Sequence, residues 1–297
     1  MKFGLTHGNM GRTSAPVLAR EMARAAEAAG FESLWSTDHA VIPSNYEHIY
    51  PETDDGQYPF PFDHPLADPF PWLTWVGAVT ERVKLGTAIC VLPQRNPIVT
   101  AKTAATVDHL TGGRLILGVG AGWLREEFEV LGADFENRGR RLRDAIPAMR
   151  TLWSGESASY QSESVSFDAV YCQPTPAHGT VPIHLGGFSE VAAKRAGRIG
   201  DGFFPGGYGD MNRLENLVTL AKKAADEAGR SANDFEITTR WSRDPSHLDV
   251  SVIQQLEEIG VHRVTVPVHI FDLDHLADEI TRFGETYIQP YNAATQH

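Results

Sequence analysis

The sequence is poor in cysteine and in long apolar runs. It has 2 cysteines among 297 residues, Cys90 and Cys172, and they form no CxxC pair. Neither a disulfide framework nor a zinc site is therefore indicated. No stretch approaches the roughly 18 consecutive apolar residues of a membrane span, and the N-terminus MKFGLTHGNM has no apolar stretch of signal-peptide length. We expect reduced thiols and a cytoplasmic location.

Positive charge is also scarce. The chain has 26 Lys and Arg against 38 Asp and Glu, a formal net charge of −12, and no long basic run. Such a balance opposes nonspecific attraction to nucleic acid and to anionic membranes. The 12 histidines show no HExxH or other metal-ligand spacing. We expect no nucleic-acid partner, no membrane partner and no metal, and any anionic ligand must be met by a local cluster of donors.

What the chain does contain is a regular alternation of strand and helix patterns, with 42% hydrophobic and 22% charged residues. The strand-like segments are KFGLT, FESLWSTDH, RVKLGTAICVL, RLILGVGA, VPIHLGG, DGFFPGG, FEITTRW and HRVTVPV. Helical patterns cover 17–29, 69–80, 98–110, 140–153, 190–198, 212–228, 250–259 and 273–283. Eight such units in this length predict an α/β fold, a single (β/α)₈ TIM barrel over residues 1–297.

Two stretches interrupt the alternation. Residues 40–68 lie between the second strand and its helix and are rich in proline and aromatic residues. Long loops at the C-terminal face of a barrel usually cover a site, so we expect an active-site loop here. Residues 155–178 alternate as in a hairpin after the fourth helix. We expect this insertion to cap the barrel or to make a subunit contact.

Residues at the C-terminal ends of barrel strands are the candidates for chemistry. The second strand ends in Thr37, Asp38 and His39. A carboxylate beside an imidazole favours general acid–base work. The alternative is a histidine satisfied by loop backbone and an aspartate that caps the turn.

Glycines mark two further strand ends. Gly118, Gly120 and Gly122 lack the spacing and context of a dinucleotide fingerprint, so they favour close approach of a planar ring, or else tight helix–strand packing. Gly186 and Gly187 precede a helix start and predict a phosphate cradle. The cations near these strand ends, each of which can equally be a solvated surface residue, are Lys194, Arg195, Arg198, Arg240 and Arg243.

Three long segments resemble a known family, the bacterial luciferase-like flavin-dependent oxidoreductases, and in particular its coenzyme F420-dependent branch. They are GFESLWSTDHAVIP, ERVKLGTAICVLPQRNPIVTAKTAATVDHLTGGRLILGVGAGWLREEFEVLGADFENRGRRL and VPIHLGGFSEVAAKRAGRIGDGFFP. Residues 207–297 match only in their barrel pattern. The resemblance implies a barrel of the luciferase-like type, usually a homodimer, with a flavin or deazaflavin at its C-terminal face.

The resemblance also implies roles for single residues. His39 would donate or accept a proton, oriented by Asp38. A non-proline cis peptide bond would join Ala88 to Ile89 and place Ile89 behind the ring. The backbone beside the ring would be formed by Gly118, Val119, Gly120, Ala121 and Gly122, and the phosphate would be received by Gly186 and Gly187.

One departure from the family pattern concerns the substrate. The family's sugar-phosphate dehydrogenases carry an acidic glutamate where this chain has Trp123. An indole can only donate from its ring nitrogen and cannot play that role, which argues against sugar-phosphate oxidation. We expect a flatter, less polar substrate, lined or covered by Tyr46, Tyr50, Phe60, Phe62, Trp72 and Trp123.

The expected activity is hydride transfer between C5 of F420 and an activated alkene or a carbonyl or alcohol, with a separate enzyme that reduces the cofactor. One alternative is an FMN-dependent monooxygenase of a two-component system, and a second is a barrel that binds flavin without turnover. A barrel glycosidase is disfavoured because it needs two carboxylates at strand ends.

Overall fold

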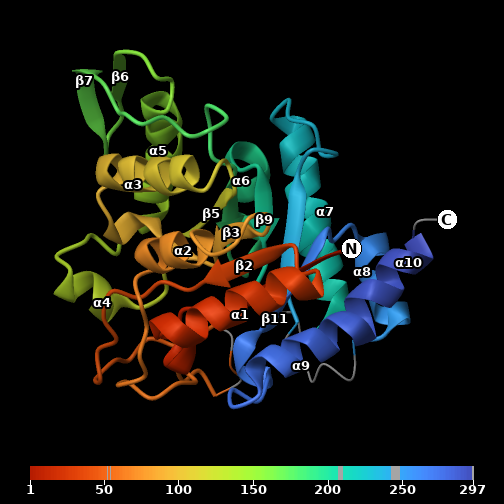
Figure 1. Cartoon of the computed structure of the whole chain (residues 1–297). Helices are drawn as coiled ribbons and strands as arrows, with labels where there is room; N and C mark the ends of the chain where they lie inside the picture. The colour runs from red at the N-terminus through yellow and green to blue at the C-terminus, as the bar shows by residue number, and fades with distance from the viewer. Residues whose placement is uncertain (52, 54, 207–209, 242–247, 296–297) are drawn as a thin grey trace.

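The computed structural model of this chain describes residues 1–51, 53, 55–206, 210–241 and 248–295, and parallel strands form the centre of the fold (Figure 1). These strands are β1 (Lys2–Thr6), β2 (Ser33–Ser36), β3 (Lys84–Thr87), β4 (Cys90–Val91), β5 (Leu115–Gly120), β8 (Ile183–Gly186), β9 (Gly202–Phe204), β10 (Glu236–Arg240) and β11 (Arg263–Pro267). β1 pairs with both β2 and β11, and β3 pairs with both β2 and β5, so the sheet closes. β3 and β4 both pair with β5 and together occupy one strand position, so the result is the predicted barrel with eight strand positions.

Helices surround the barrel (Figure 1). They are α1 (Pro16–Ala29), α2 (Pro69–Gly77), α3 (Pro97–Leu110), α4 (Arg125–Val130), α5 (Arg138–Leu152), α6 (Glu190–Ile199), α7 (Met211–Glu227), α8 (Val250–Ile259), α9 (Leu276–Phe283) and α10 (Gln289–Thr295). Local sequence sets several ends. Proline stands in the first turn of α1, α2 and α3. Gly30, at φ 93°, ends α1 in the left-handed conformation that glycine adopts without strain.

The core lies between the barrel and its helices, and a polar network closes the N-terminal end of the barrel. Leu34, Leu85 and Leu117 are fully buried on three strands. Arg263 is 1% exposed and forms a two-pronged pair with Glu32, at 2.7 and 2.8 Å. Its Nη1 also lies 3.2 Å from Glu236. This end is filled with paired structural charge, which leaves the opposite end of the barrel for a ligand.

The insertion at 155–178 contains the expected hairpin. β6 (Ala158–Gln161) and β7 (Ser166–Val170) pair antiparallel. The hairpin projects beyond α3 and α5 in Figure 1. The described residues of 40–68 form an irregular loop, tied to the chain after β1 by a bridge between Met10 and Leu66. Among the described residues, no helix is both long and apolar enough to cross a membrane.

The structure corrects several element boundaries. The third predicted strand is broken between Thr87 and Cys90 into β3 and β4. α2 ends at Gly77 rather than residue 80, and α9 begins at Leu276 rather than residue 273. A π-helical turn, Gly284–Ile288, follows α9. In the DGFFPGG segment only Gly202–Phe204 is strand, and its last residue lies outside the described part of the chain.

Candidate functional site

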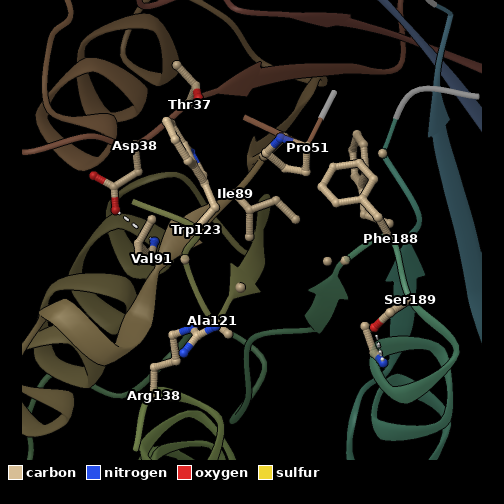
Figure 2. Close-up of a pocket in the computed structure, with 18 of the residues that line it drawn as sticks. Thr37, Asp38, Pro51, Ile89, Val91, Ala121, Trp123, Arg138, Phe188 and Ser189 are labelled. Atoms are coloured by element: carbon tan, nitrogen blue, oxygen red, sulfur yellow. Dashed lines mark hydrogen bonds between the residues drawn. The ribbon is translucent and has the colours of Figure 1, made fainter. Parts of the chain in front are cut away.

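A cavity of about 760 Å³ opens at the C-terminal ends of the strands. It is lined after β1 by Thr6 and His7, after β2 by Thr37–His39, between β3 and β4 by Ala88 and Ile89, after β5 by Gly120–Trp123, after β8 by Gly186–Ser189, after β9 by Phe204 and Gly206, and at the end of β10 by Arg240. Figure 2 shows Ile89 between the side that carries Asp38 and Trp123 and the side that carries Phe188 and Ser189. Nearly every stave thus contributes to one concave site, as in barrel enzymes.

Ile89 stands on a bulge that two glycines accommodate. The peptide bond between Ala88 and Ile89 is cis, as the resemblance implies. A Cβ on Gly186 would lie 1.7 Å from Ile89 Cδ1, and a Cβ on Gly120 would lie 3.3 Å from Ile89 Cγ2. A Cβ on Gly186 would collide with Ile89 and one on Gly120 would be tight against it, so the two glycines make room for the Ile89 side chain where it lines the cavity.

His39 is held by Glu127, a residue that the sequence analysis did not single out. His39 Nδ1 lies 2.9 Å from a Glu127 carboxylate oxygen, and the two side chains are 9% and 1% exposed. The other carboxylate oxygen accepts the backbone N–H groups of Ala40, at 2.7 Å, and Val41, at 3.3 Å. The carboxylate thus fixes both the imidazole and the start of the 40–68 loop.

Charge distribution makes Glu127 an anion. Burial alone would raise the pKa of Glu127, but hydrogen bonding and attraction from His39, with a further hydrogen bond from the Val41 amide, hold that pKa below its ordinary value. An ionised carboxylate can only accept, so His39 Nδ1 carries the proton that lies between them. Nε2 is then the ring nitrogen that can exchange a proton with a ligand.

Asp38 does not orient His39, which corrects the prediction. Its carboxylate accepts the backbone N–H of Val91 at 2.9 Å, a contact drawn in Figure 2, and the Arg95 guanidinium at 2.7 and 3.2 Å. Arg95 also pairs with Asp68, the N-cap of α2. Asp38 therefore lines the cavity but joins the end of β2 to β4, because the charged guanidinium and a backbone amide outcompete the neighbouring imidazole.

The signal for Glu127 is present in the sequence. Leu124, Glu127 and Phe128 are spaced as neighbours on one face of a helical turn, and both apolar residues are buried, at 1% and 0% exposure. A glutamate on that inward face must be paired if it is to be ionised. Amphipathic spacing alone does not say which residue pairs with it.

The first turn of α6 forms the opposite end of the cavity. Ser189 caps the helix, and its Oγ accepts the N–H of Ala192 at 3.2 Å (Figure 2). The amides of Glu190 and Val191 have no intrahelical acceptor at this position of a helix. These amides and the helix dipole form an anion-binding end.

Gly187 contributes shape rather than a free amide, which corrects part of the phosphate prediction. Gly186 and Gly187 both line the cavity. The N–H of Gly187, however, donates to the carbonyl of Phe204 at 3.1 Å. Gly187 has φ 150°, and a Cβ there would lie 2.5 Å from Ala192 Cβ. Glycine is needed here because the chain passes close to α6.

Arginines supply positive charge near the helix start. Arg195 and Arg138 line the cavity, and Arg138 lies over the Phe135 ring at 3.7 Å. Burial, followed by repulsion from Arg143 and Arg138, lowers the pKa of Arg195. Such a crowd of like charges favours an anionic ligand.

The other predicted cations have different surroundings. Lys194 pairs with Glu190 at 3.3 Å, and Arg198 is exposed on α6. Arg240 lines the cavity at the end of β10. Arg243 lies outside the described residues.

An aromatic cluster lies over the His39 side of the cavity. Tyr50 and Trp123 line it, with ring centroids 5.1 Å apart. Trp123 also contacts His39 at 6.1 Å and Tyr46 at 5.8 Å. Tyr58, which was not predicted, packs edge-on against His39 at 5.7 Å. The 40–68 loop therefore supplies a wall of rings, as expected of an active-site loop.

Four of the six predicted pocket aromatics do not line the cavity. Tyr46 lies behind Trp123, and Phe60 lies behind His7, with centroids 6.1 Å apart. Phe62 is 51% exposed because it sits on the outer side of the loop. Trp72 is 4% exposed, and its Nε1–H donates to the Thr13 carbonyl at 3.1 Å. Trp72 belongs to the core because α2 packs its apolar face inward.

Gly118 and Val119 are also absent from the cavity wall that the structure describes, unlike Gly120, Ala121 and Gly122. A Cβ on Gly118 would lie 1.9 Å from the Thr87 carbonyl oxygen, so this glycine allows close strand packing. Val119 is fully buried in the core. Gly118 and Val119 therefore serve close packing, which was the alternative interpretation. The prediction that this backbone lies beside a ring is left with Gly120, Ala121 and Gly122.

The end of β1 adds residues that the sequence analysis missed. Asn9 donates to the carbonyls of Thr37 and Ala67, at 2.8 and 2.6 Å, and accepts the Thr37 N–H at 2.8 Å. It thereby fixes the end of β2 relative to the active-site loop. His7 has φ 62°, and this turn lets consecutive residues Thr6 and His7 both line the cavity.

Comparison with known proteins places this geometry in a family. The family model described as luciferase-like monooxygenase matches residues 1–242, and the chain belongs to that family. An uncharacterized protein of Mycobacterium tuberculosis is 34% identical over 245 residues, 82% of this chain and 83% of that protein. The F420-dependent glucose-6-phosphate dehydrogenase of Mycolicibacterium fortuitum is 34% identical over 233 residues, 76% of this chain and 64% of the enzyme.

Solved structures support the fold. An F420-dependent secondary alcohol dehydrogenase, in complex with an F420-acetone adduct, has a TM-score of 0.75 at 20% identity and covers 95% of this chain and 97% of its own. The coenzyme F420 dependent tetrahydromethanopterin reductase of Methanopyrus kandleri has a TM-score of 0.75 at 18% identity, covering 98% and 99%. Within the described residues, no group of three or more His, Cys, Asp or Glu side chains is arranged to hold a metal ion.

Proposed function

We propose that the protein is a coenzyme F420-dependent oxidoreductase that transfers hydride to or from a small organic molecule, with His39 handling the accompanying proton. The cavity's His39–Glu127 pair, next to the Ile89 bulge, is the observation that carries this proposal. Relatives at 34% and 32% identity that are named F420-dependent support the choice of cofactor.

The residues present fit a deazaflavin with a phosphorylated tail. Gly120 and Gly186 make room for Ile89, whose side chain lines the cavity and offers a surface for a flat ring. The first turn of α6 and Arg195 suit the phosphate. When bound, F420 supplies hydride transfer at C5 of its ring, and the protein's part is to bind, align and exclude water.

His39 is the acid–base residue in this proposal. Its Nε2 donates or accepts one proton at the substrate, and Glu127 keeps the other proton on Nδ1 in both states. The charged partner stabilises the imidazolium when it forms. A storage barrel without turnover has no need of a buried carboxylate–imidazole pair in this place.

The substrate is expected to be flat and of low polarity. Trp123, Tyr50 and Tyr58 surround His39 with aromatic surface. Activated alkenes, or carbonyls and alcohols with an apolar body, fit this aromatic surface better than sugar phosphates do. We further propose that the chain is a single domain and that it forms a homodimer, which light scattering can check. A separate enzyme would reduce the F420.

The test uses reduced F420 and reduced FMN with a panel of unsaturated and carbonyl compounds. We expect recovery of the visible absorbance of oxidised F420 with at least one compound and without oxygen uptake. His39→Ala should lower kcat by about 100-fold or more while F420 still binds. Rapid oxygen consumption with reduced FMN, and no reaction with reduced F420, would instead identify a monooxygenase.

A further inference from the structure

Two helices that border the cavity carry arginines that form no ion pair. Arg138 is the first residue of α5, Arg195 lies in the second turn of α6, and both line the cavity. Neither side chain forms an ion pair with any residue in the described part of the chain. In Figure 2, Arg138 and Ser189, the cap of α6, lie on opposite sides of this end of the cavity. This end of the cavity is therefore positively charged.

The head group of Arg195 reaches the cavity wall. A Cβ on Gly139 would lie 3.4 Å from Arg195 Nη2. Gly139 itself lines the cavity, next to Arg138. The guanidinium of Arg195 therefore lies at the wall, where α6 meets the start of α5, and not only the stem of the side chain borders the cavity.

A third arginine extends the positive charge away from the cavity. After burial, repulsion from Arg143 and from Arg138 lowers the pKa of Arg195, so the three guanidiniums lie near one another. Arg143 is 61% exposed, and its Nε is 3.8 Å from the Asp144 carboxylate. It comes five residues after Arg138 on α5, about 7.5 Å further along the helix axis. The arginines thus form a series that leads from the cavity toward solvent.

The position of these charges is unfavourable for the helix itself. α5 begins with Arg138, and its first turn contains no acidic residue. Positive charge at a helix N-terminus is repelled by the helix dipole. Glu136 lines the cavity and attracts Arg138, but it pairs with Arg125. Arginines held together against this repulsion indicate a binding site for an anion.

F420 carries more negative charge than its phosphate alone. The phosphate is a diester with a single negative charge, and the first turn of α6 and Arg195 suit it. The tail that follows the phosphate is a chain of glutamates, each of which adds a carboxylate. Arg138 and Arg143 are the cations next to Arg195 that remain for these carboxylates.

We propose that Arg138 and Arg143 bind carboxylates of the glutamate tail, so that the protein prefers F420 with a long tail to F420 without glutamates. This proposal rests on the proposed function, because it needs F420 in the cavity. A guanidinium and a carboxylate form paired, charge-assisted hydrogen bonds, which give such a contact its strength. The contacts are partly exposed, so the preference depends on ionic strength.

The test compares F420 that carries five glutamates with F420 that carries none. Binding of each to the full-length protein is measured by fluorescence titration. At low ionic strength we expect the tailed form to bind about tenfold more tightly. In about 0.5 M NaCl we expect the difference to fall below about twofold, because salt screens partly exposed charges.

Charge-removing variants locate the contact. Arg138→Gln combined with Arg143→Gln should bring the affinity for the tailed form close to that for the tail-free form, which itself should change less than about twofold. Arg143→Gln alone alters only an exposed side chain and should remove part of the preference, which keeps the test decisive if the double variant folds poorly. Arg138→Lys with Arg143→Lys keeps both charges and should keep the preference. Arg20→Gln, at an exposed position of α1, is the control for loss of one charge elsewhere.

Three outcomes would overturn the proposal and leave the proposed function standing. They are equal binding of the two forms at low ionic strength, a preference that persists unchanged in salt, and an equal loss of affinity for both forms in the glutamine variants. The last would assign these arginines to the phosphate. Failure of the wild type to bind either form would contradict the proposed function as well.

Discussion

Among single residues, the geometry of the site depends on which carboxylate pairs with the His39 imidazole and which pairs with the Arg95 guanidinium. Two carboxylates are candidates to orient His39: Asp38 is its neighbour in the sequence, and Glu127 is its neighbour in the folded structure. Asp38 is engaged by Arg95 and the Val91 amide, and Glu127 by His39 and two loop amides. Adjacency in the sequence was therefore a poor guide to pairing, because successive residues at a strand end point in different directions.

The first prediction concerns the charge on Glu127. Glu127→Gln keeps the size and removes the charge, so we expect kcat to fall about 10- to 100-fold because the imidazolium of His39 loses its counter-ion. The affinity for F420, measured by fluorescence titration, should stay unchanged. Glu126→Gln is the control. Glu126 holds the loop through the Glu47 amide and His48, and its variant should keep a kcat close to that of the wild type. A wild-type kcat in Glu127→Gln would contradict the assigned role.

At the scale of elements, periodicity predicted the fold well and the uses of its glycines less well. The strands and their order could be predicted, because strand and helix patterns that alternate along the chain favour a parallel sheet whose strands follow the chain order. Gly118, Gly120 and Gly186 look alike in the sequence. Their different roles depend on what lies across from each one, the Thr87 carbonyl or the Ile89 side chain, and only the folded structure shows that.

The second prediction compares two glycine variants. In Gly118→Ala the new methyl group meets the Thr87 carbonyl oxygen, which is backbone and cannot yield. We expect a loss of about 3 kcal/mol in the free energy of unfolding, measured by urea denaturation. In Gly186→Ala the methyl group meets the tip of Ile89, which can turn aside into the ring space. We expect F420 affinity to fall about tenfold, with a smaller loss of stability. The same effect on stability and affinity in both variants would contradict this division of roles.

At the scale of the whole molecule, function and stability occupy opposite ends of the barrel. Arg263, Glu32 and Glu236 fill the N-terminal end with paired charges. No sequence pattern indicated this network, because its three residues lie far apart along the chain. The resemblance led to the cofactor end, whereas the ion pairs of the other end emerge only from closure of the sheet.

The third prediction concerns stability in acid. Burial alone would raise the pKa of Glu236, but Arg263 and Lys2 lower it to about 2, from 4.5. A lowered carboxyl pKa contributes stability that is present above about pH 4.5 and is lost as the pH falls toward 2. After allowance for solvent screening this is roughly 2 kcal/mol.

Glu236→Gln should therefore be less stable than the wild type at neutral pH and should show a flatter dependence of unfolding free energy on pH below about 4.5. Urea denaturation at several pH values measures this. Glu190→Gln, which removes an exposed charge in the first turn of α6 and its surface pair with Lys194, is the control and should change stability by only about 0.5 kcal/mol. Parallel pH curves for Glu236→Gln and the wild type would contradict the assignment.

The choice of cofactor is tested by fluorescence titration of the purified protein with coenzyme F420 and, in parallel, with FMN. We expect tight, saturable binding of the deazaflavin and much weaker binding of FMN. Preferential binding of FMN would contradict it, and would direct the search to oxygen-consuming oxidations with a partner reductase.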